Sequence, residues 1–123
     1  MVKPIPNKLL NQRISDAWRR SKRRGHYFPP PRDPGRKIYK EEFMMKKWVE
    51  QNGICALTGE KMAIETQQDD VASWDRIDSD GTYMEYKNVQ WVCDWANKMK
   101  GNATKEEGLR RAKVFIEYQN RCK

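Results

Sequence analysis

The core of the fold is predicted from the segment Ser73-Trp74-Asp75-Arg76-Ile77-Asp78, together with Asn88-Val89-Gln90 and Cys93-Asp94-Trp95-Ala96-Asn97-Lys98-Met99-Lys100. Residues 71–77 and 89–92 are short runs rich in β-branched and aromatic side chains, which predicts two strands. Residues 94–100 predict a short helix that ends at Gly101. This order places a carboxylate at the end of a strand, an amide in the connecting loop, and a second amide with a lysine on the helix.

Helices are predicted on the N-terminal side of this segment. Residues 8–24 form a helical pattern with Asn7 as its N-cap and Gly25 as its stop, and the expected buried stripe is Leu10, Ile14, Ala17 and Trp18. Residues 26–36 contain four prolines and cannot be regular helix, so we expect a stiff extended connector. Residues 40–52 predict a second helix that stops at Gly53 and presents Phe43, Met44 and Trp48, with Met44 and Met45 as core residues.

The remaining segments complete an α+β fold. Residues 54–64 predict a β-hairpin around a turn at 58–61. Thr104 and Glu107 form a capping box for a final helix, whose expected apolar stripe is Leu109, Ala112, Phe115 and Ile116. We expect residues 1–36 to form a basic helix with a proline-rich arm, and residues 37–123 to form the core with a C-terminal helix.

The charge distribution predicts binding to a polyanion. The chain has a net charge of +8, and residues 1–47 hold 14 Lys/Arg against 4 Asp/Glu, while the remainder is close to neutral. A solubilising surface is the other interpretation, but aromatic residues interleaved with the basic ones favour nucleic acid. The predicted nucleic-acid contacts are Arg19, Arg20, Lys22, Arg23, Arg24, His26, Arg32 and Arg36.

Composition also bears on location. No apolar stretch is long enough for a membrane span and no apolar signal-peptide core follows the N-terminus, so we expect a cytoplasmic protein. The three cysteines cannot all pair with one another, which favours reduced thiols.

The side chains around the helix predict a hydrolytic site. Asp75 and Asn97 offer hard oxygen donors, and two such ligands suffice for an Mg²⁺ or Mn²⁺ ion that arrives with a phosphate. Lys100 follows Asn97 by three residues, hence on the same helix face, where it could contact a phosphate oxygen. Asn88 is expected to brace the loop through backbone hydrogen bonds. The plain alternative is an ordinary Asp75–Arg76 ion pair beside a solvated helix face.

Residues 54–108 resemble the HNH nuclease family, with its ββα-metal fold. The similarity is closest to phage and homing-type members, in which an Asp-Arg-Ile strand end precedes a glycine–tyrosine loop, here Asp75-Arg76-Ile77 and Gly81-Thr82-Tyr83; residues 102–107 match the next segment of many members of that group. The resemblance implies metal-dependent hydrolysis of double-stranded DNA, in the cytoplasm of a phage-infected host. By position, Asp75 and Asn97 would be the metal ligands and Asn88 the bracing residue.

The catalytic set expected from residues and resemblance is Asp75, Arg76, Asn88, Asn97 and Lys100. The family's general base is a histidine directly after the metal-binding aspartate, where this chain has Arg76. A guanidinium stays protonated at neutral pH and cannot accept a proton. In one alternative Arg76 clamps the scissile phosphate, and the metal or a carboxylate such as Asp78 activates the water. In the other, catalysis is lost and only DNA binding remains. His26 as a displaced base and an RNA-directed nuclease are weaker alternatives.

Zinc-containing members of the family carry paired Cys-x-x-Cys motifs. This chain keeps Cys55 and Cys93, with Thr58 and Ala96 at the partner positions. Two thiolates do not complete a tetrahedral site, so we expect buried packing cysteines rather than a structural zinc. Trp91 and Trp95 are the candidates for the hydrophobic packing that replaces it.

Overall fold

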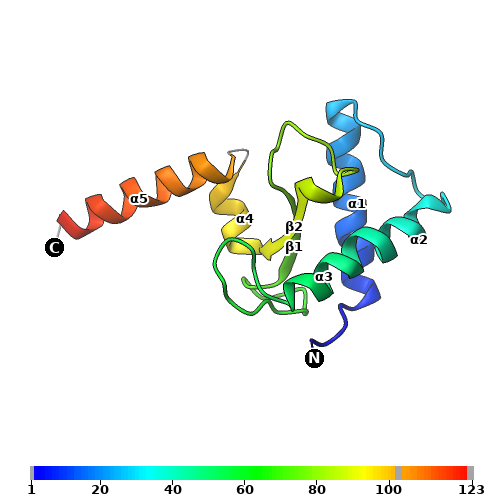
Figure 1. Cartoon of the computed structure of the whole chain (residues 1–123), viewed down its shortest axis with the longest axis horizontal. Coiled ribbons are helices and arrows are strands. Elements are labelled where there is room, and N and C mark those ends of the chain that lie inside the picture. Colours follow the sequence, from blue (N-terminus) through cyan, green and yellow to red (C-terminus); the bar gives the residue numbers. More distant parts are fainter. Residues whose placement is uncertain (1, 102–103, 122–123) are drawn as a thin grey trace.

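The computed structural model describes residues 2–101 and 104–121 (Figure 1), so Asn102 and Cys122 lie outside the described part. The fold is α+β, as predicted. In chain order the elements are α1 (Asn7–Arg24), α2 (Gly35–Tyr39), the π-helix η1 (Lys40–Met45), α3 (Lys46–Gln51), β1 (Ala72–Arg76), the 3₁₀ helix η2 (Tyr86–Asn88), β2 (Val89–Cys93), α4 (Asp94–Lys100) and α5 (Lys105–Arg121). Within these residues no helix has the length and apolar character needed to span a membrane.

The two strands form an antiparallel pair at the centre of the molecule. Trp74 pairs with Trp91 and Asp75 with Gln90, and every residue of both strands is buried. Helix α4 begins directly after β2, and the Asp94 N–H donates to the Val71 carbonyl oxygen at 2.9 Å. This hydrogen bond holds the start of α4 beside β1, so the helix lies against the strand that carries Asp75.

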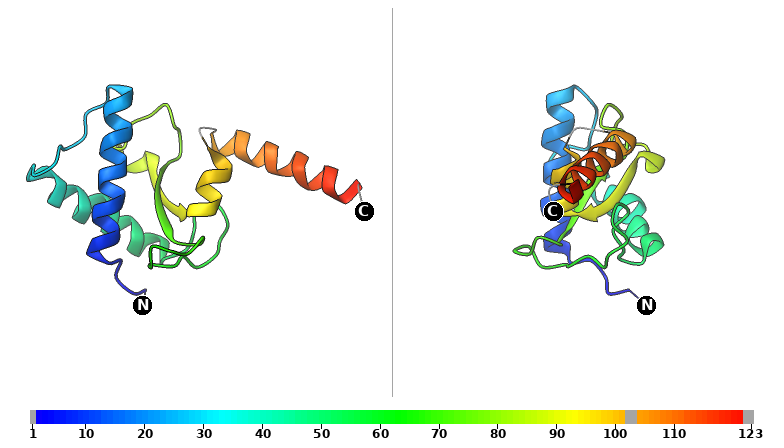
Figure 2. Two further views of the ribbon diagram at one scale, coloured as in Figure 1. Left: turned by 180° about the vertical axis from the view of Figure 1, so that it is seen from behind. Right: turned by 90° about the vertical axis from the view of Figure 1, so that its left-hand side faces the viewer.

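Helix α1 packs alongside this strand pair (Figure 2). Leu10, Ile14 and Ala17 are buried as predicted, whereas Trp18 is only half-buried. The Arg13 Nε group donates to the Ala72 carbonyl oxygen at 2.9 Å, which ties α1 to β1. Gly25 ends the helix with φ of 71°, a left-handed conformation that glycine adopts without strain. The N-cap is Pro6 rather than Asn7.

The second helical segment is longer than predicted. It begins at Gly35 instead of residue 40 and runs without a break through α2, η1 and α3 to Gln51. Proline at position 34 fits a helix start, since its missing N–H is not needed there. Met44 and Trp48 are buried as predicted, and the Trp91 indole N–H donates to the Met44 carbonyl oxygen at 2.8 Å. The connector is therefore irregular only over residues 26–34.

The hairpin predicted at residues 54–64 is not formed as a ladder. The described residues there show two isolated bridges, Ile54 with Lys61 and Ala63 with Val71. Cys55 and Met62 each pack into the core, but the chain between them curls into turns, with Gly59 at φ of 74°. Side-chain burial without continuous backbone pairing explains why the strand pattern was misleading.

Helix α5 extends away from the rest of the molecule (Figures 1 and 2). The Glu107 N–H donates to Thr104 Oγ1 at 3.1 Å, so half of the predicted capping box forms, while the Glu107 carboxylate pairs with Arg110 instead. The predicted stripe does not reach the core: Leu109, Phe115 and Ile116 are each more than half exposed. They border an apolar groove of about 510 Å³ between α4 and α5. Helical periodicity predicted which residues share the apolar face of α5, but it could not predict whether that face packs against the core.

Candidate active site

A pocket of about 240 Å³ lies where β1, α4 and α1 approach one another. Its lining is mostly polar and charged, and comprises Arg20, Asp75, Arg76, Ser79, Tyr83, Asp94, Asn97, Lys98 and Gly101. Asp75 comes from β1 and Asn97 from α4, so the two predicted metal ligands border one pocket. Asn88 and Lys100, also predicted for the site, do not line it.

Asp75 is held by two buried donors. Its Oδ2 atom accepts hydrogen bonds from Lys100 Nζ at 2.9 Å and from Gln90 Nε2 at 3.0 Å. Gln90 is the residue paired with Asp75 across the sheet, so the strand register itself supplies this donor. Both contacts go to Oδ2, and a cation in the pocket would therefore bind through Oδ1.

Lys100 is placed differently from the prediction. Its side chain is only 4 % exposed, and Nζ donates to Asp75 and to the Arg76 carbonyl oxygen. The prediction put Lys100 beside Asn97 facing a phosphate; instead the buried carboxylate attracts the ammonium group inward, beneath the strand end. Lys100 acts here as the counter-ion of Asp75, and a direct contact with substrate stays a prediction.

Asn97 is oriented by β1. Its Nδ2 group donates to Ser73 Oγ at 3.0 Å, and Ser73 lies on the same face of the strand as Asp75, two residues away. Because the amide nitrogen is engaged by Ser73, the carbonyl oxygen Oδ1 is the end of the side chain suited to binding a cation.

Asp94 is the site residue that sequence reasoning missed. It lies three residues before Asn97, hence on the same face of α4, and it lines the pocket while paired with Lys98 at 3.0 Å. The Asp-x-x-Asn spacing was the signal available in the sequence. Asp78, named as a possible base, does not line this pocket; its Oδ1 accepts the Asp80 N–H at 3.0 Å.

The donor set suits a hard divalent cation. Carboxylate and amide oxygens are the ligands that Mg²⁺ and Mn²⁺ prefer, with water and substrate phosphate completing the coordination. Among the described residues no cluster of three or more His, Cys, Asp or Glu side chains forms a pre-built metal cage. Asp75 and Asn97 offer two such oxygens, and Lys100 is a competing positive charge at Asp75. Binding of Mg²⁺ or Mn²⁺ by them stays a prediction.

Asn88 makes the backbone hydrogen bonds that the loop-bracing prediction required. Its Oδ1 accepts the Asp78 N–H at 2.8 Å, and its Nδ2 donates to the carbonyl oxygens of Asp78 at 3.1 Å and Thr82 at 3.2 Å. A Cβ atom on Gly81 would lie 2.6 Å from Asn88 Nδ2, so glycine permits this close approach. The catalytic role of Asn88 stays a prediction; its role in holding the loop is structural.

Replacing Asn88 with alanine is expected to destabilise the protein by about 1–3 kcal/mol, because three loop hydrogen bonds are lost at once. The free energy of unfolding measured in urea tests this. Asn120→Ala, on the exposed face of α5, is the matched control and should change stability by less than about 0.5 kcal/mol. Equal stabilities for the two variants would contradict the bracing role.

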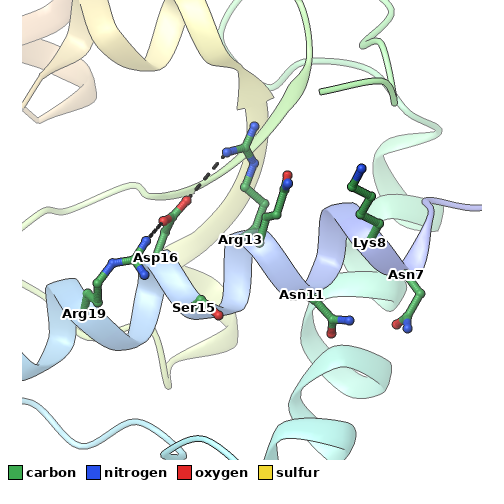
Figure 3. Close-up of a pocket in the computed structure, with 8 residues that line it drawn as sticks. Asn7, Lys8, Asn11, Arg13, Ser15, Asp16 and Arg19 are labelled. Atoms are coloured by element: carbon green, nitrogen blue, oxygen red, sulfur yellow. Dashed lines mark hydrogen bonds and ion pairs between the residues drawn. The ribbon is translucent and has the colours of Figure 1, made fainter. Parts of the chain in front are cut away.

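The predicted nucleic-acid contacts do not share one environment. Arg20 lines the pocket, and Arg24 Nη1 pairs with Asp80 at 3.2 Å. Figure 3 shows Arg13 and Arg19 both directed at Asp16 along a groove of about 720 Å³ on α1. That carboxylate partly neutralises the groove.

The remaining basic candidates lie on or near the connector. Lys22 and Arg36 lie over the Trp18 ring at 5.2 and 5.7 Å from its centroid, while Arg23 and Arg32 are exposed. His26 is half-buried rather than on the surface, and its Nδ1 atom has no hydrogen-bond partner among the described residues. Contact of these side chains with nucleic acid stays a prediction.

Cys55 and Cys93 are buried packing residues, as predicted. The Cys93 N–H donates to Cys55 Sγ at 3.1 Å, and Thr58 Oγ1 lies 3.9 Å from Cys93 Sγ. Trp91 is fully buried nearby as expected, but Trp95 is 37 % exposed and does not fill this role. Burial alone would raise the pKa of the Cys55 thiol, but hydrogen bonds from Thr58 and from three backbone N–H groups lower it.

Cys93 makes stability depend on alkaline pH. Burial, together with the neighbouring Cys55, raises the pKa of Cys93 to about 11, whereas an unfolded cysteine titrates near about 8.5. Above the lower value the unfolded chain loses a proton that the folded chain keeps, so stability falls as pH rises. We expect the free energy of unfolding to decrease between about pH 8.5 and pH 9.5, below the tyrosine range, and Cys93→Ala to flatten this slope. An unchanged slope in the variant would assign the effect elsewhere.

Comparisons of this chain with protein-family models, with curated proteins and with solved structures find no match.

Proposed function

We propose that the chain is a divalent-metal-dependent endonuclease that nicks or cuts double-stranded DNA, with a ββα-metal core made of β1, β2 and α4. The observation that carries the proposal is that Asp75 and Asn97, from a strand end and a following helix, border the same small pocket. A strand–strand–helix order and a basic α1 beside the pocket add support. The resemblance to phage and homing-type HNH nucleases points the same way.

Each residue has a role in this proposal. Asp75 and Asn97 would hold the ion, while Lys100, Gln90 and Ser73 keep the two ligand side chains oriented. A bound Mg²⁺ or Mn²⁺ supplies Lewis-acid chemistry, polarising the phosphate and stabilising the leaving oxygen.

Asn88 and Arg76 complete the proposed site. Asn88 fixes the loop that follows β1. Arg76, buried at the strand end, offers a guanidinium to the phosphate rather than a base to water.

Relaxation of supercoiled plasmid tests the activity. The wild-type protein should nick the plasmid with Mg²⁺ or Mn²⁺ and stop doing so with a chelator. Asn97→Ala should lower the rate by roughly 100-fold, in line with losing a few kcal/mol of transition-state stabilisation, while Asn120→Ala should not. Absence of metal-dependent nicking by a folded protein that still binds DNA would reject the enzyme.

A second candidate is a DNA-binding module that does not cleave. The observation in its favour is that the Asp75 carboxylate already has an ammonium partner, at 2.9 Å from Lys100 Nζ. Arg76 in the position of the family's base supports the same interpretation. Gel-shift binding measured beside the plasmid assay separates the candidates, because the module should bind duplex DNA equally with and without the divalent ion. RNA substrates in the same assay test the weaker RNA-directed alternative.

A further inference from the structure

Two arginines from distant parts of the chain converge on the pocket. Arg20 belongs to α1 and Arg76 to β1, yet both line the pocket that holds Asp75 and Asn97. Arg20 is half-buried and Arg76 is 7 % exposed. A helix that the sequence marks only as a basic arm therefore contributes a side chain to the candidate active site.

A single buried side chain, Tyr83, holds both guanidinium groups. Arg20 Nη1 donates to the Tyr83 hydroxyl oxygen at 3.3 Å, and the Arg76 guanidinium carbon lies 4.7 Å from the centre of the Tyr83 ring. Arg76 Nη1 also donates to the Gly81 carbonyl oxygen at 3.1 Å. A cation over an aromatic face is attracted by the ring quadrupole, so Tyr83 fixes the two arginines through different parts of one side chain.

Tyr83 is itself fixed by the aromatic core. The Tyr39 hydroxyl donates to the Tyr83 carbonyl oxygen at 2.8 Å, and the Trp74 indole N–H donates to the Tyr39 hydroxyl oxygen at 2.9 Å. Burial raises the pKa of Tyr39, so its hydroxyl keeps its proton at neutral pH and remains a donor. Helix α2 and strand β1 thus set the position of Tyr83.

The two arginines of the pocket have no carboxylate within ion-pair distance among the described residues, although the charges of Asp16 and Asp75 act on Arg20 from farther away. Asp75 pairs with Lys100, and Asp94 pairs with Lys98. Across the described residues, no ion pair forms to Arg20 or to Arg76. A guanidinium has five N–H donors, so each group retains donors beyond the contacts described above. Charges held away from water are costly unless paired, and an anion in the pocket would provide the partner.

We propose that Arg20 and Arg76 form a two-arginine clamp for one phosphate of a phosphodiester, with Tyr83 as the positioning residue that holds both. The role of the clamp in cleavage rests on the proposed nuclease function. Paired arginines bind phosphate through parallel N–H···O bonds, which fixes its orientation as well as its charge. The clamp links the basic helix α1 to the centre, so DNA lying along α1 is delivered with a phosphate at Asp75 and Asn97.

The clamp is tested first without metal or cleavage. Inorganic phosphate is titrated into ¹⁵N-labelled protein while the side-chain Nε–H signals of arginines are followed by NMR. The signals of Arg20 and Arg76 should shift together with one dissociation constant, while Arg121, on exposed α5, should not respond. Equal shifts at Arg121, or none at Arg20, would overturn the clamp.

Conservative variants separate the role of Tyr83 from general destabilisation. Tyr83→Phe keeps the ring beneath Arg76 and removes only the hydroxyl that fixes Arg20, so the single phosphate dissociation constant read from the Arg20 and Arg76 signals should rise roughly tenfold. Arg20→Gln should weaken phosphate binding similarly while keeping the Tyr83 side chain intact, and Arg20→Lys should restore only part of the binding. Unchanged phosphate affinity in both Tyr83→Phe and Arg20→Gln would overturn the proposal.

Duplex DNA in place of inorganic phosphate distinguishes a phosphodiester from a free phosphate as the ligand. A clamp for DNA predicts that a short duplex, without divalent metal, displaces inorganic phosphate from Arg20 and Arg76; persistence of the phosphate-bound signals would overturn it. Failure of the clamp and failure of the nuclease are distinguishable. Phosphate binding without nicking rejects the nuclease alone, whereas metal-dependent nicking with unchanged kcat/KM in Arg20→Gln rejects the clamp alone.

Discussion

Asp75→Asn is expected to reduce metal-dependent plasmid nicking by roughly 10³-fold, because it removes the negative charge that the pocket presents to a divalent ion. The amide keeps the size of the side chain and can still accept hydrogen bonds from Lys100 Nζ and Gln90 Nε2, which contact the carboxylate at 2.9 and 3.0 Å. The change keeps the shape of the side chain but leaves the buried Lys100 ammonium group without its carboxylate, so the free energy of unfolding of the variant is measured beside its rate. Initial rates at saturating Mg²⁺ measure it, since a weakened ion affinity alone would be overcome there.

The control for this change is Asp69→Asn, which removes one negative charge from an exposed side chain outside the pocket. It should nick at the wild-type rate. Asp75→Asn should also bind duplex DNA at least as tightly as the wild type, because it lowers negative charge near the bound phosphates. A variant that nicks as fast as the wild type would remove Asp75 from the centre and leave the DNA-binding module as the remaining candidate.

Lys100→Met is expected to lower the free energy of unfolding by about 3–5 kcal/mol, because it leaves the Asp75 carboxylate buried without its cation. Both side chains are almost fully enclosed, at 4 % and 9 % exposure, so water replaces the lost partner only in part. Lys98→Met is the matched control. It breaks an exposed pair on the same helix, with Asp94 at 3.0 Å, and should cost less than about 1 kcal/mol.

Two further measurements identify the cause of that loss. The double variant Asp75→Asn/Lys100→Met should recover much of the stability, since neither buried charge then remains, and the pair should show a coupling energy in a double-mutant cycle. Mg²⁺ or Mn²⁺ should stabilise Lys100→Met more than the wild type, because the ion no longer competes with the ammonium group for Asp75. Equal metal stabilisation of both proteins would place the ion elsewhere.

The sequence predicted the elements around the pocket well because their signals are local. Runs of β-branched and aromatic residues marked β1 and β2, and Gly101 marked the end of α4. Asp75 and Asn97 line one pocket, while a shared ion between them stays a prediction. Asn88 was foreseen as a brace from its place in the connection between the two strands and from the family resemblance, and its side chain makes three hydrogen bonds to loop backbone.

The features that were missed depend on tertiary contacts. Lys100 was assigned to the face of Asn97, but a buried carboxylate on a neighbouring strand determines where a long side chain points. Arg20 and Tyr83 are 63 positions apart, and no spacing rule joins them. The expected hairpin at 54–64 does not form because its apolar residues pack into the core one at a time, without a continuous strand ladder. On α5 the apolar residues lie on one face as predicted, but that face is exposed rather than buried.

The cross-strand pair Trp74 and Trp91 is an intrinsic circular-dichroism probe of the strand pair. The two indoles lie 4.8 Å apart between ring centroids, one from each strand, and their pair in the strand register is next to the pair Asp75 and Gln90. Electronic transitions of rings this close couple, and the resulting circular-dichroism couplet vanishes when the strands separate. Spectra of each variant thus report whether the scaffold under position 75 is intact before any rate is compared.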